Sequence, residues 1–373
     1  MKIGIVLYPT FGGSGVVATE LGKALAKKGH EVHFITYSQP VRLGSFSENI
    51  YYHEVAISDY PLFDYQPYET ILASKMVDVV KYEKLDILHV HYAIPHASAA
   101  YMAQQILKSQ GITIPYVTTL HGTDITLVGK DPSFEPVITF CINQSDAVTT
   151  VSESLKEDTY THFNTNREIL VVPNFIETEE FLKERSEEKR NCYAKDCEPI
   201  LCHISNFRKV KRVEDVLKMF ELVNKEIPSK LFFVGDGPER NNLERLCREL
   251  DLCGRVVFVG KVNDTKQALE MSDLFILPSE TESFGLAALE AMAVGVPVIS
   301  SNTGGIPEVN IHGETGFLSN VGDVEDMAKN AILLLKDKEM YQRFRQNAFN
   351  RAKVFSLENV LPLYEAIYER LVK

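Results

Sequence analysis

The stretch PSETESFGLAALEAMAVGVP, from Pro278 to Pro297, decides the fold prediction for this chain. Its run from 284 to 294 is rich in Ala and Leu and stops at Gly295, which predicts a helix. The segment MSDLFILPS just before it predicts a short buried strand. The motif therefore lies at the carboxyl end of a strand, where open α/β sheets bind ligands.

The start of this helix is a candidate anion site. Ser283 is the predicted cap, so Glu282 would lie at the mouth of the helix and Glu290 would share a face with Leu286. N–H groups of a first turn lack intrahelical partners, and Gly285 leaves room for a phosphate to approach them. The two carboxylates can accept hydrogen bonds from hydroxyls, and a nucleoside diphosphate sugar offers hydroxyls on both sugars. Glu282 and Glu290 could instead be ordinary exposed glutamates, which is the common case. The strand that precedes them favours the ligand site over this alternative.

Length and composition bound the class of protein. A chain of 373 residues suggests two domains, and its 45% hydrophobic content is that of a globular protein. With 39 basic and 51 acidic residues the net charge is −12, and without a basic stripe we expect no nucleic-acid partner. No apolar run approaches about 18 residues and the chain opens on a strand, so we expect no integral membrane segment and a cytoplasmic location. The six cysteines form no C-x-x-C motif, which favours reduced thiols.

The first half begins with a unit of Rossmann type. KIGIVLY predicts a buried strand, a glycine-rich turn follows, and a helix is expected over 16–28 before the strand VHFITY. Such a turn, with Gly13, Ser14 and Gly15, can cradle a diphosphate. It does not match G-x-G-x-x-G, and no acidic residue clearly ends the second strand, so we do not expect a nicotinamide cofactor.

The alternation of strands and helices continues through the first half. Residues 38–68 predict an irregular excursion and 69–83 a helix, and the next strand, DILHVHY, places His89 and His91 on one side. Polar packing of this pair is favoured over metal binding, because further ligands are not found. His121 follows the strand IPYVTTL. Its side chain can reach into a cleft or have a structural role, and the residues alone do not decide between these two roles.

The two halves are joined by a charged segment. Ser152 is a predicted helix cap, EILVVPNFI predicts a sixth strand, and the charged residues 177–199 predict the interdomain connection. From Pro199 the strand and helix pattern restarts, which predicts a second doubly wound sheet. A basic loop follows its first strand and predicts a phosphate clamp made of Arg208, Lys209, Lys211 and Arg212.

Together these motifs resemble a known family. SNFRKVKR, FVGDGPER, FVGKV, the stretch from SDLFILPSETESFGL to GGIPEV, and HGETGFL resemble the second half of a family 4 retaining glycosyltransferase with the GT-B fold. The resemblance covers essentially the whole chain. In the first half GGSGVVATELGKALAKKGHEVHFITY, LHVHYAIPHASAA and TTLHGTDIT are similar to members that join N-acetylglucosamine to L-malate in the first step of bacillithiol synthesis.

The resemblance implies an architecture and substrates. It implies an α/β protein of the GT-B type, with two Rossmann-like doubly wound domains that face each other across a cleft. Residues 1–175 would form the acceptor domain and 176–356 the donor domain, with a carboxy-terminal helix in 357–373 that crosses back. UDP-N-acetylglucosamine and L-malate would be the substrates, and a homodimer is left open.

The resemblance also implies roles for individual residues. Glu282 and His121 would approach the transferred sugar as catalytic residues, and Glu290 would bind the ribose hydroxyls. Lys211 would contact the donor diphosphate. Asn206 stands where many relatives have arginine, which removes one charge that Arg208 can replace. The remaining donor-binding groups would be the glycine turn and the start of the SFGL helix: Gly13, Ser14, Gly15, Ser283, Phe284, Gly285 and Leu286.

A catalytic mechanism follows from these roles. Lys211, the helix start and the glycine turn would stabilise the departing nucleotide, and no D-x-D motif is present, so we expect no metal and no cofactor beyond the co-substrate. Retention would come from attack on the same face, with the leaving phosphate accepting the proton. A covalent route through a carboxylate ranks second, because Glu290 at the ribose leaves only Glu282 near the sugar.

The acceptor pocket is the least defined part of the prediction. Malate is a small dianion, so a pocket for it needs cations and hydrogen-bond donors, and the candidates are Lys75, Tyr92 and Thr119. Each is also an ordinary surface or strand-end residue. Transfer to a lipid or polysaccharide, a UDP-sugar epimerase and a non-catalytic nucleotide-sugar sensor stay open, because this scaffold hosts several chemistries.

Overall fold

The chain folds into two compact units. The computed structural model describes residues 1–10, 12–44, 47–56, 66–177, 190–194, 198–262 and 264–372. One unit comprises Met1–Asn174 and Glu358–Lys373, and the other comprises Phe175–Leu357. The predicted connection at 177–199 lies mostly outside the described residues. The division at Asn174 and Phe175 lies one residue from the limit expected at 175.

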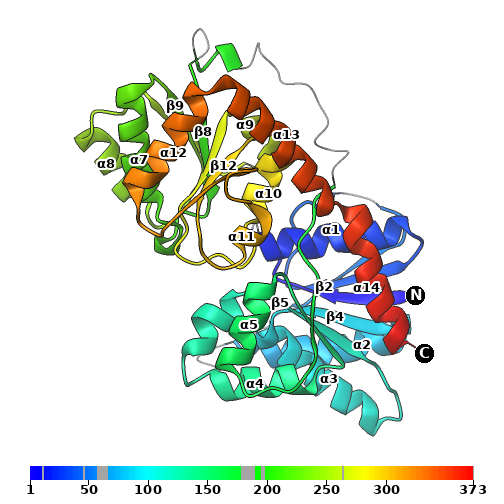
Figure 1. Ribbon diagram of the computed structural model, residues 1–373. Coiled ribbons are helices and arrows are strands. Elements are labelled where there is room, and N and C mark those ends of the chain that lie inside the picture. Colours follow the sequence, from blue (N-terminus) through cyan, green and yellow to red (C-terminus); the bar gives the residue numbers. More distant parts are fainter. Residues whose placement is uncertain are drawn as a thin grey trace. The chain divides into compact units, whose positions relative to one another are not determined.

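The first unit is built on a parallel sheet with helices on its faces (Figure 1). In the described part of the chain the strand order is β3-β2-β1-β4-β5-β6-β7. The strands are β1 Lys2–Val6, β2 Glu31–Thr36, β3 Ile50–Glu54, β4 Ile87–His91, β5 Tyr116–Leu120, β6 Ala147–Thr150 and β7 Ile169–Val171. The helices are α1 Gly13–Lys27, α2 Tyr68–Glu83, α3 Ser98–Ser109, α4 Glu135–Gln144, α5 Glu153–His162 and α14 Leu357–Leu371. The order reverses direction between β1 and β4, which is where such sheets bind ligands.

Two details of the first unit differ from the sequence prediction. Helix α1 begins at Gly13, three residues before the expected start at 16, so Gly13 and Gly15 lie in its first turn and not in a separate turn. A Cβ on Gly15 would lie 2.5 Å from the carbonyl oxygen of Tyr8, so the close approach of β1 and α1 requires glycine. Strand β3 was not predicted; it pairs with β2 at the sheet edge and exposes Tyr51 and Tyr52.

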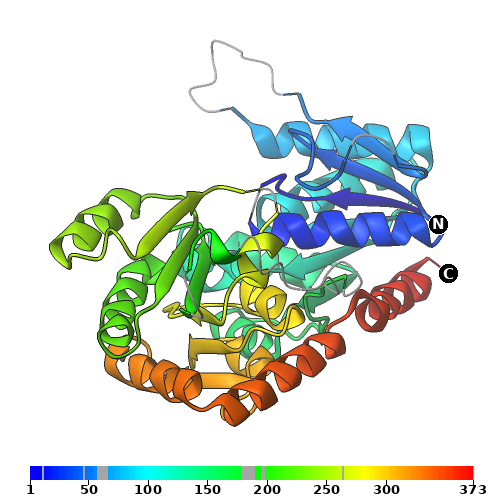
Figure 2. The same ribbon diagram turned by 90° about the horizontal axis from the view of Figure 1, so that it is seen from above.

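The last helix belongs to the first unit. In both views α14 lies with the strands and helices of the first half of the chain (Figures 1 and 2). Tyr368 on α14 is fully buried, and its hydroxyl is 2.7 Å from Nδ1 of His89 on β4. Glu365 contacts His30 at 3.4 Å. The carboxy-terminal helix therefore completes the core of the unit that the amino terminus begins.

The second unit repeats the design with a parallel sheet in the order β10-β9-β8-β11-β12-β13. The strands are β8 Ile200–Ser205, β9 Lys230–Gly235, β10 Val256–Gly260, β11 Leu274–Leu277, β12 Val298–Ser301 and β13 Gly316–Ser319. The helices are α7 Val213–Glu226, α8 Arg240–Glu249, α9 Lys266–Glu270, α10 Leu286–Ala293, α11 Ile306–Val309, α12 Val324–Lys336 and α13 Lys338–Val354. Here the order reverses between β8 and β11.

The helix of the PSETESFGL stretch starts later than predicted. Helix α10 begins at Leu286, and the residue that precedes it is Gly285, with φ +93° in the left-handed region. The prediction that Ser283 caps the helix is wrong, because no side chain caps α10 and Gly285 turns the chain into it. Phe284 is buried and packs edge-on against Phe355, with 5.4 Å between the ring centroids.

No described helix combines the length and the apolar character that crossing a membrane requires.

Candidate active site

The loops after β8 and β11 meet where the order of the second sheet reverses. The loop after β8 carries the basic residues and the loop after β11 carries Glu282. The N–H of Glu280 donates to the carbonyl of Val210 at 2.8 Å, which ties the two loops together. Because parallel strands point their carboxyl ends to one edge, residues some 70 positions apart in the sequence become neighbours here.

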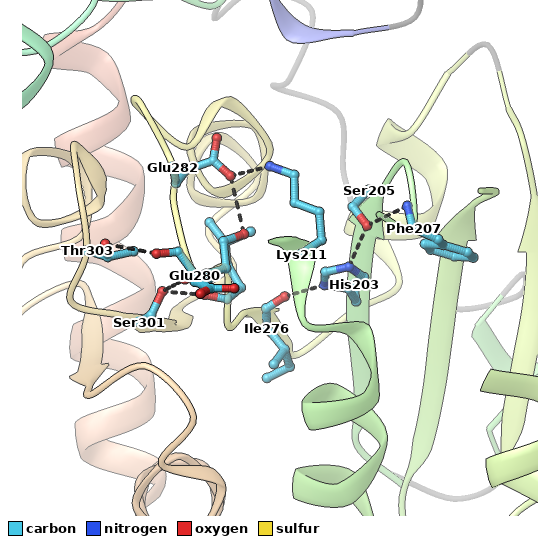
Figure 3. A network of polar contacts seen from close by, with 11 residues as sticks. His203, Ser205, Phe207, Lys211, Ile276, Glu280, Glu282, Ser301 and Thr303 are labelled. Carbon is cyan, nitrogen blue, oxygen red and sulfur yellow. Dashed lines mark hydrogen bonds and ion pairs between the residues drawn. The ribbon is translucent and has the colours of Figure 1, made fainter. Parts of the chain in front are cut away.

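Lys211 and Glu282 form an ion pair at this edge. The Nζ atom of Lys211 lies 2.5 Å from Oε2 of Glu282, and both side chains are about one-fifth exposed (21% and 17%). Figure 3 shows the two side chains pointing toward one another. Ser279 donates a second hydrogen bond to the same carboxylate oxygen at 3.3 Å. A partly buried cation is thus held at the point where open sheets bind anionic ligands.

The backbone of Glu282 is fixed by the turn that follows β12. The N–H of Gly305 donates to the carbonyl of Glu282 at 2.9 Å, and Ser301 donates to the carbonyl of Ser279 at 2.6 Å. Thr303 donates to the carbonyl of Glu280 at 3.2 Å (Figure 3). The carboxylate therefore projects from a loop whose position is set by several backbone contacts.

His203, a buried histidine on β8, is hydrogen-bonded to groups that hold the start of the basic loop after β8. Nδ1 of His203 donates to the carbonyl of Ile276 at 2.8 Å, while Nε2 accepts from Ser205 at 2.8 Å (Figure 3). The hydroxyl of Ser205 in turn accepts from the N–H of Phe207 at 3.2 Å. Burial lowers the pKa of His203 to about 4, so the ring is neutral at pH 7. This chain of bonds joins β8 and β11 to the start of the loop.

The other predicted donor-binding residues of the second unit lie on the same two loops and on α10. Glu290 is buried on α10, and its Oε2 accepts from Thr265 at 3.2 Å. Asn206 and Arg208 are exposed on the loop after β8. Arg212 is already paired with Asp215, with 2.6 Å between Nε and Oδ2, so it is engaged with its own helix.

The first unit brings a second group together at its own reversal point. Ser14 in the first turn of α1 and Tyr92 at the end of β4 share a hydrogen bond of 2.6 Å between their hydroxyls. Tyr92 has φ +85°, an uncommon backbone conformation for a residue other than glycine, and its ring contacts those of Tyr8 and His121. Burial raises the pKa of Tyr92 to about 12, so its hydroxyl stays protonated.

His121 follows β5 and is held by its neighbours. Its Nε2 lies 2.8 Å from Nδ1 of His91, and the two rings stack at 5.1 Å. The carboxylate of Asp124 accepts from the N–H groups of His121, Gly122 and Ala93. Burial lowers the pKa of His121 to about 3 and raises that of Asp124 to about 6. The imidazole is therefore neutral at pH 7.

Two of the residues predicted to bind the acceptor substrate, Thr119 and Lys75, are less well placed to contact a ligand. Thr119 is fully buried, and its hydroxyl contacts Nε2 of His89 at 2.7 Å and Thr149 at 2.6 Å, so it belongs to the interior network. Lys75 is half-buried on α2. The pKa of His53 is lowered mainly by burial, and the charge of Lys75 makes a smaller contribution. The positions of the three side chains therefore favour Tyr92 over Lys75 and Thr119 as the candidate for contact with the acceptor substrate.

Comparison with known proteins identifies the family. The chain is 50% identical over 99% of its length to N-acetyl-alpha-D-glucosaminyl L-malate synthase of Bacillus anthracis, of which it covers 96%. It is 30% identical over 95% of its length to an uncharacterized glycosyltransferase of Methanocaldococcus jannaschii, of which it covers 93%. Residues 11–180 match the model of Glycosyltransferase Family 4, and residues 184–351 match Glycosyl transferases group 1. The chain belongs to glycosyltransferase family 4.

Solved structures agree on the fold of this family 4 glycosyltransferase. Sucrose-phosphate synthase from Thermosynechococcus elongatus aligns with TM-score 0.82 and 21% identity, over 99% of this chain and 98% of that one. Anabaena HepE in complex with UDP and glucose aligns with TM-score 0.81 and 19% identity, over 100% of this chain and 99% of that one. The prediction of a GT-B glycosyltransferase with two parallel α/β sheets is confirmed.

Several site residues of this glycosyltransferase could not be found from the sequence. The support that His203 gives the basic loop depends on which strands are neighbours, and the bond from Thr265 to Glu290 depends on the packing of α9 against α10. The sequence did place His89 and His91 on one side of β4, and their rings stack at 4.5 Å. The partner of His91, His121, directly follows the adjacent strand β5 and was predicted for a separate reason.

Proposed function

We propose that this glycosyltransferase transfers N-acetylglucosamine from UDP-N-acetylglucosamine to the hydroxyl of L-malate with retention, the first step of bacillithiol biosynthesis. The observation that carries the proposal is the 50% identity to N-acetyl-alpha-D-glucosaminyl L-malate synthase of Bacillus anthracis, which extends over nearly the full length of both chains.

The donor would bind through the second unit. Lys211 would stabilise the charge that develops on the departing diphosphate, and Glu282 holds its ammonium group at the sheet edge. The N–H groups at the start of α10 would contribute further donors, and Glu290 would accept from the ribose hydroxyls. These contacts supply charge stabilisation through protein groups, so we propose that the reaction needs no metal ion.

The acceptor would bind through the first unit. Tyr92 presents its hydroxyl beside His121, and that hydroxyl is 2.6 Å from the one of Ser14, which belongs to the glycine turn predicted to bind the donor diphosphate. The malate hydroxyl would attack on the face that the leaving phosphate occupies, and that phosphate would accept the proton. No protein base is then required, which is consistent with the low pKa of His121, because burial lowers it to about 3 and so makes the imidazole a poor proton acceptor.

The test follows UDP release and product mass together. Purified protein is incubated with UDP-N-acetylglucosamine and EDTA, with and without L-malate. We expect UDP release that depends on malate and a product with the mass of the condensed pair. Release without malate would indicate hydrolysis or epimerisation. Activity only with a lipid or glycan acceptor would keep the donor site and remove malate as the substrate.

A further inference from the structure

Four histidines gather at the carboxyl ends of β4 and β5. His89 and His91 lie on β4, His96 lies in the short helical turn that follows, and His121 lies after β5. The ring of His89 is fixed by Tyr368 and Thr119, each at 2.7 Å, and it stacks on His91 at 4.5 Å. His96 donates from Nδ1 to the backbone carbonyl of His91. The ring of His91 thus packs against a fixed neighbour, and the bond from His96 holds its backbone.

The side chain of His91 makes one polar contact among the described residues. Its Nδ1 atom lies 2.8 Å from Nε2 of His121, and the planes of the two rings differ by 24°. Its other nitrogen, Nε2, is buried and has no hydrogen-bond partner in the described part of the chain. Burial, and to a smaller extent the neighbouring imidazoles, lower the pKa of His91 well below its usual value, and burial also lowers that of His121. Each ring of the pair therefore carries a single proton near pH 7.

Only two arrangements of those protons fit the contact. In one, His91 carries its proton on Nδ1 and donates it to Nε2 of His121. In the other, His121 donates from Nε2, and His91 must then carry its proton on Nε2 as a buried N–H without a partner. Orphaned buried N–H groups are rare in proteins, and an unpaired acceptor is tolerated more readily. The burial of Nε2 therefore selects the first arrangement.

We propose that His91 is a positioning residue that fixes His121 in the tautomer with its proton on Nδ1. The Nδ1–H group of His121 is then a hydrogen-bond donor at the carboxyl end of β5, and its lone pair on Nε2 is occupied by His91. His121 in this form donates to an oxygen of a ligand and does not accept a proton from it. This role in the reaction rests on the proposed function, whereas the tautomer itself does not.

The tautomer can be measured without any activity. Long-range proton–nitrogen correlation spectra of protein labelled with 15N-histidine distinguish protonated from unprotonated ring nitrogens, and the spectrum of His121→Gln identifies the His121 signals. We expect a protonated Nδ1 and an unprotonated Nε2 at His121 at pH 7.5. A His121 protonated on Nε2 would overturn the proposal, whatever the enzyme turns over.

Variants of His91 test the consequence for catalysis. In His91→Asn the side-chain amide can replace the Nδ1 donor, whereas His91→Leu removes it. By analogy with the outer partners of metal-bound histidines, we expect kcat to fall about tenfold to a hundredfold in His91→Leu and to recover within about threefold in His91→Asn. The KM for UDP-N-acetylglucosamine should change less than kcat in both variants.

A matched control separates positioning from stability. His33 is also fully buried in the first sheet and contacts another histidine, His53, at 2.8 Å, but it lies outside the site. His33→Leu should retain wild-type kcat per folded molecule. Equal losses of kcat in His33→Leu and His91→Leu would show that His91 only stabilises the fold. Wild-type protein inactive toward malate would refute the proposed function and leave the tautomer measurement unaffected.

Discussion

Lys211 is the residue on which we expect the proposed donor site to depend most. Its ammonium group is the cation that Glu282 and the two joined loops hold at the reversal point of the second sheet. Lys211→Ala should lower kcat/KM for the donor about a hundredfold to a thousandfold, as loss of one charge-stabilising group does in other enzymes. Initial rates of UDP release measure the effect.

Lys209 was predicted as a member of the phosphate clamp, but it is exposed whereas the Lys211 side chain is largely buried, so it provides the control for this substitution. It lies two residues away on the same loop and is exposed, so Lys209→Ala changes the net charge equally. We expect its kcat/KM to stay within about threefold of wild type, because an exposed charge is screened by solvent. Similar losses in the two variants would mean that the loop acts through its total charge and that the ion pair has no special role.

Tyr92 is the residue that best tests the acceptor pocket. Its hydroxyl is 2.6 Å from that of Ser14 and would contact malate. Tyr92→Phe should raise the KM for malate about tenfold through the loss of one hydrogen bond, with less effect on the KM for the donor. Tyr82→Phe, at a residue that is 78% exposed on α2, is the matched control. Lys75→Ala tests the weaker candidate, and an unchanged KM for malate would remove Lys75 from the pocket.

Among the elements, the turn after β12 controls the position of Glu282. Gly304 has φ +55°, and a Cβ at this position would lie 2.0 Å from the carbonyl oxygen of Glu282. Gly304→Ala should therefore lower the free energy of unfolding by more than the roughly 1–2 kcal/mol that a left-handed backbone costs a residue with a Cβ. It should also raise the KM for the donor. Urea unfolding and donor kinetics measure the two effects.

Gly313 separates the backbone cost from the steric clash. It has φ +77° and no atom within 4 Å of the Cβ position, so Gly313→Ala carries the conformational cost alone. We expect it to lower stability without changing the KM for the donor. If both alanine variants raise that KM alike, Gly304 does not act by holding Glu282.

The elements themselves were largely predictable, because buried parallel strands and amphipathic helices leave clear patterns. Helix α2 begins one residue from its predicted start, and Ser152 caps α5 by accepting from the N–H of Leu155 at 3.1 Å, as predicted. Strand β3 was missed because an edge strand with exposed tyrosines does not show the continuous apolar run of a buried strand. The Ser283 cap was wrong because Gly285 turns the chain into α10 instead.

The site was predictable as a set of residues and not as a set of contacts. Glu282 and Lys211 were both named from motifs, but their ion pair joins residues 71 positions apart across neighbouring strands. The bond from His91 to His121 likewise requires the parallel register of β4 and β5, which pairs His91 with Thr119. Sequence patterns fix the strands, whereas the order of strands in the sheet decides which side chains meet.

At the scale of the whole molecule, the buried histidines make stability depend on pH. Burial lowers the pKa of four of them from 6.5 to about 3 or about 4: His89, His96, His121 and His203. Between these values and 6.5 the unfolded chain binds protons that the folded chain does not. Stability must therefore fall as pH decreases through 6.5, by about 1.4 kcal/mol per pH unit for each ring.

One carboxyl opposes this trend. The pKa of Asp124 is raised from 3.8 to about 6 by burial, so below pH 6 the folded chain holds a proton that the unfolded chain releases. A single carboxyl cannot offset four imidazoles, and we expect the urea midpoint to be lower at pH 5.0 than at pH 7.5. Circular dichroism measures it, and an equal or higher midpoint at pH 5.0 would refute the neutral histidine network.

A proton NMR time course of the protein with UDP-N-acetylglucosamine, L-malate and EDTA tests the proposed transfer directly. We expect UDP and a new glycoside to appear in equal amounts only when malate is present. The anomeric proton of that glycoside should show the small coupling constant of an α linkage, because the donor configuration is retained. A β-linked product, or no new anomeric signal with malate, would refute retaining transfer to malate.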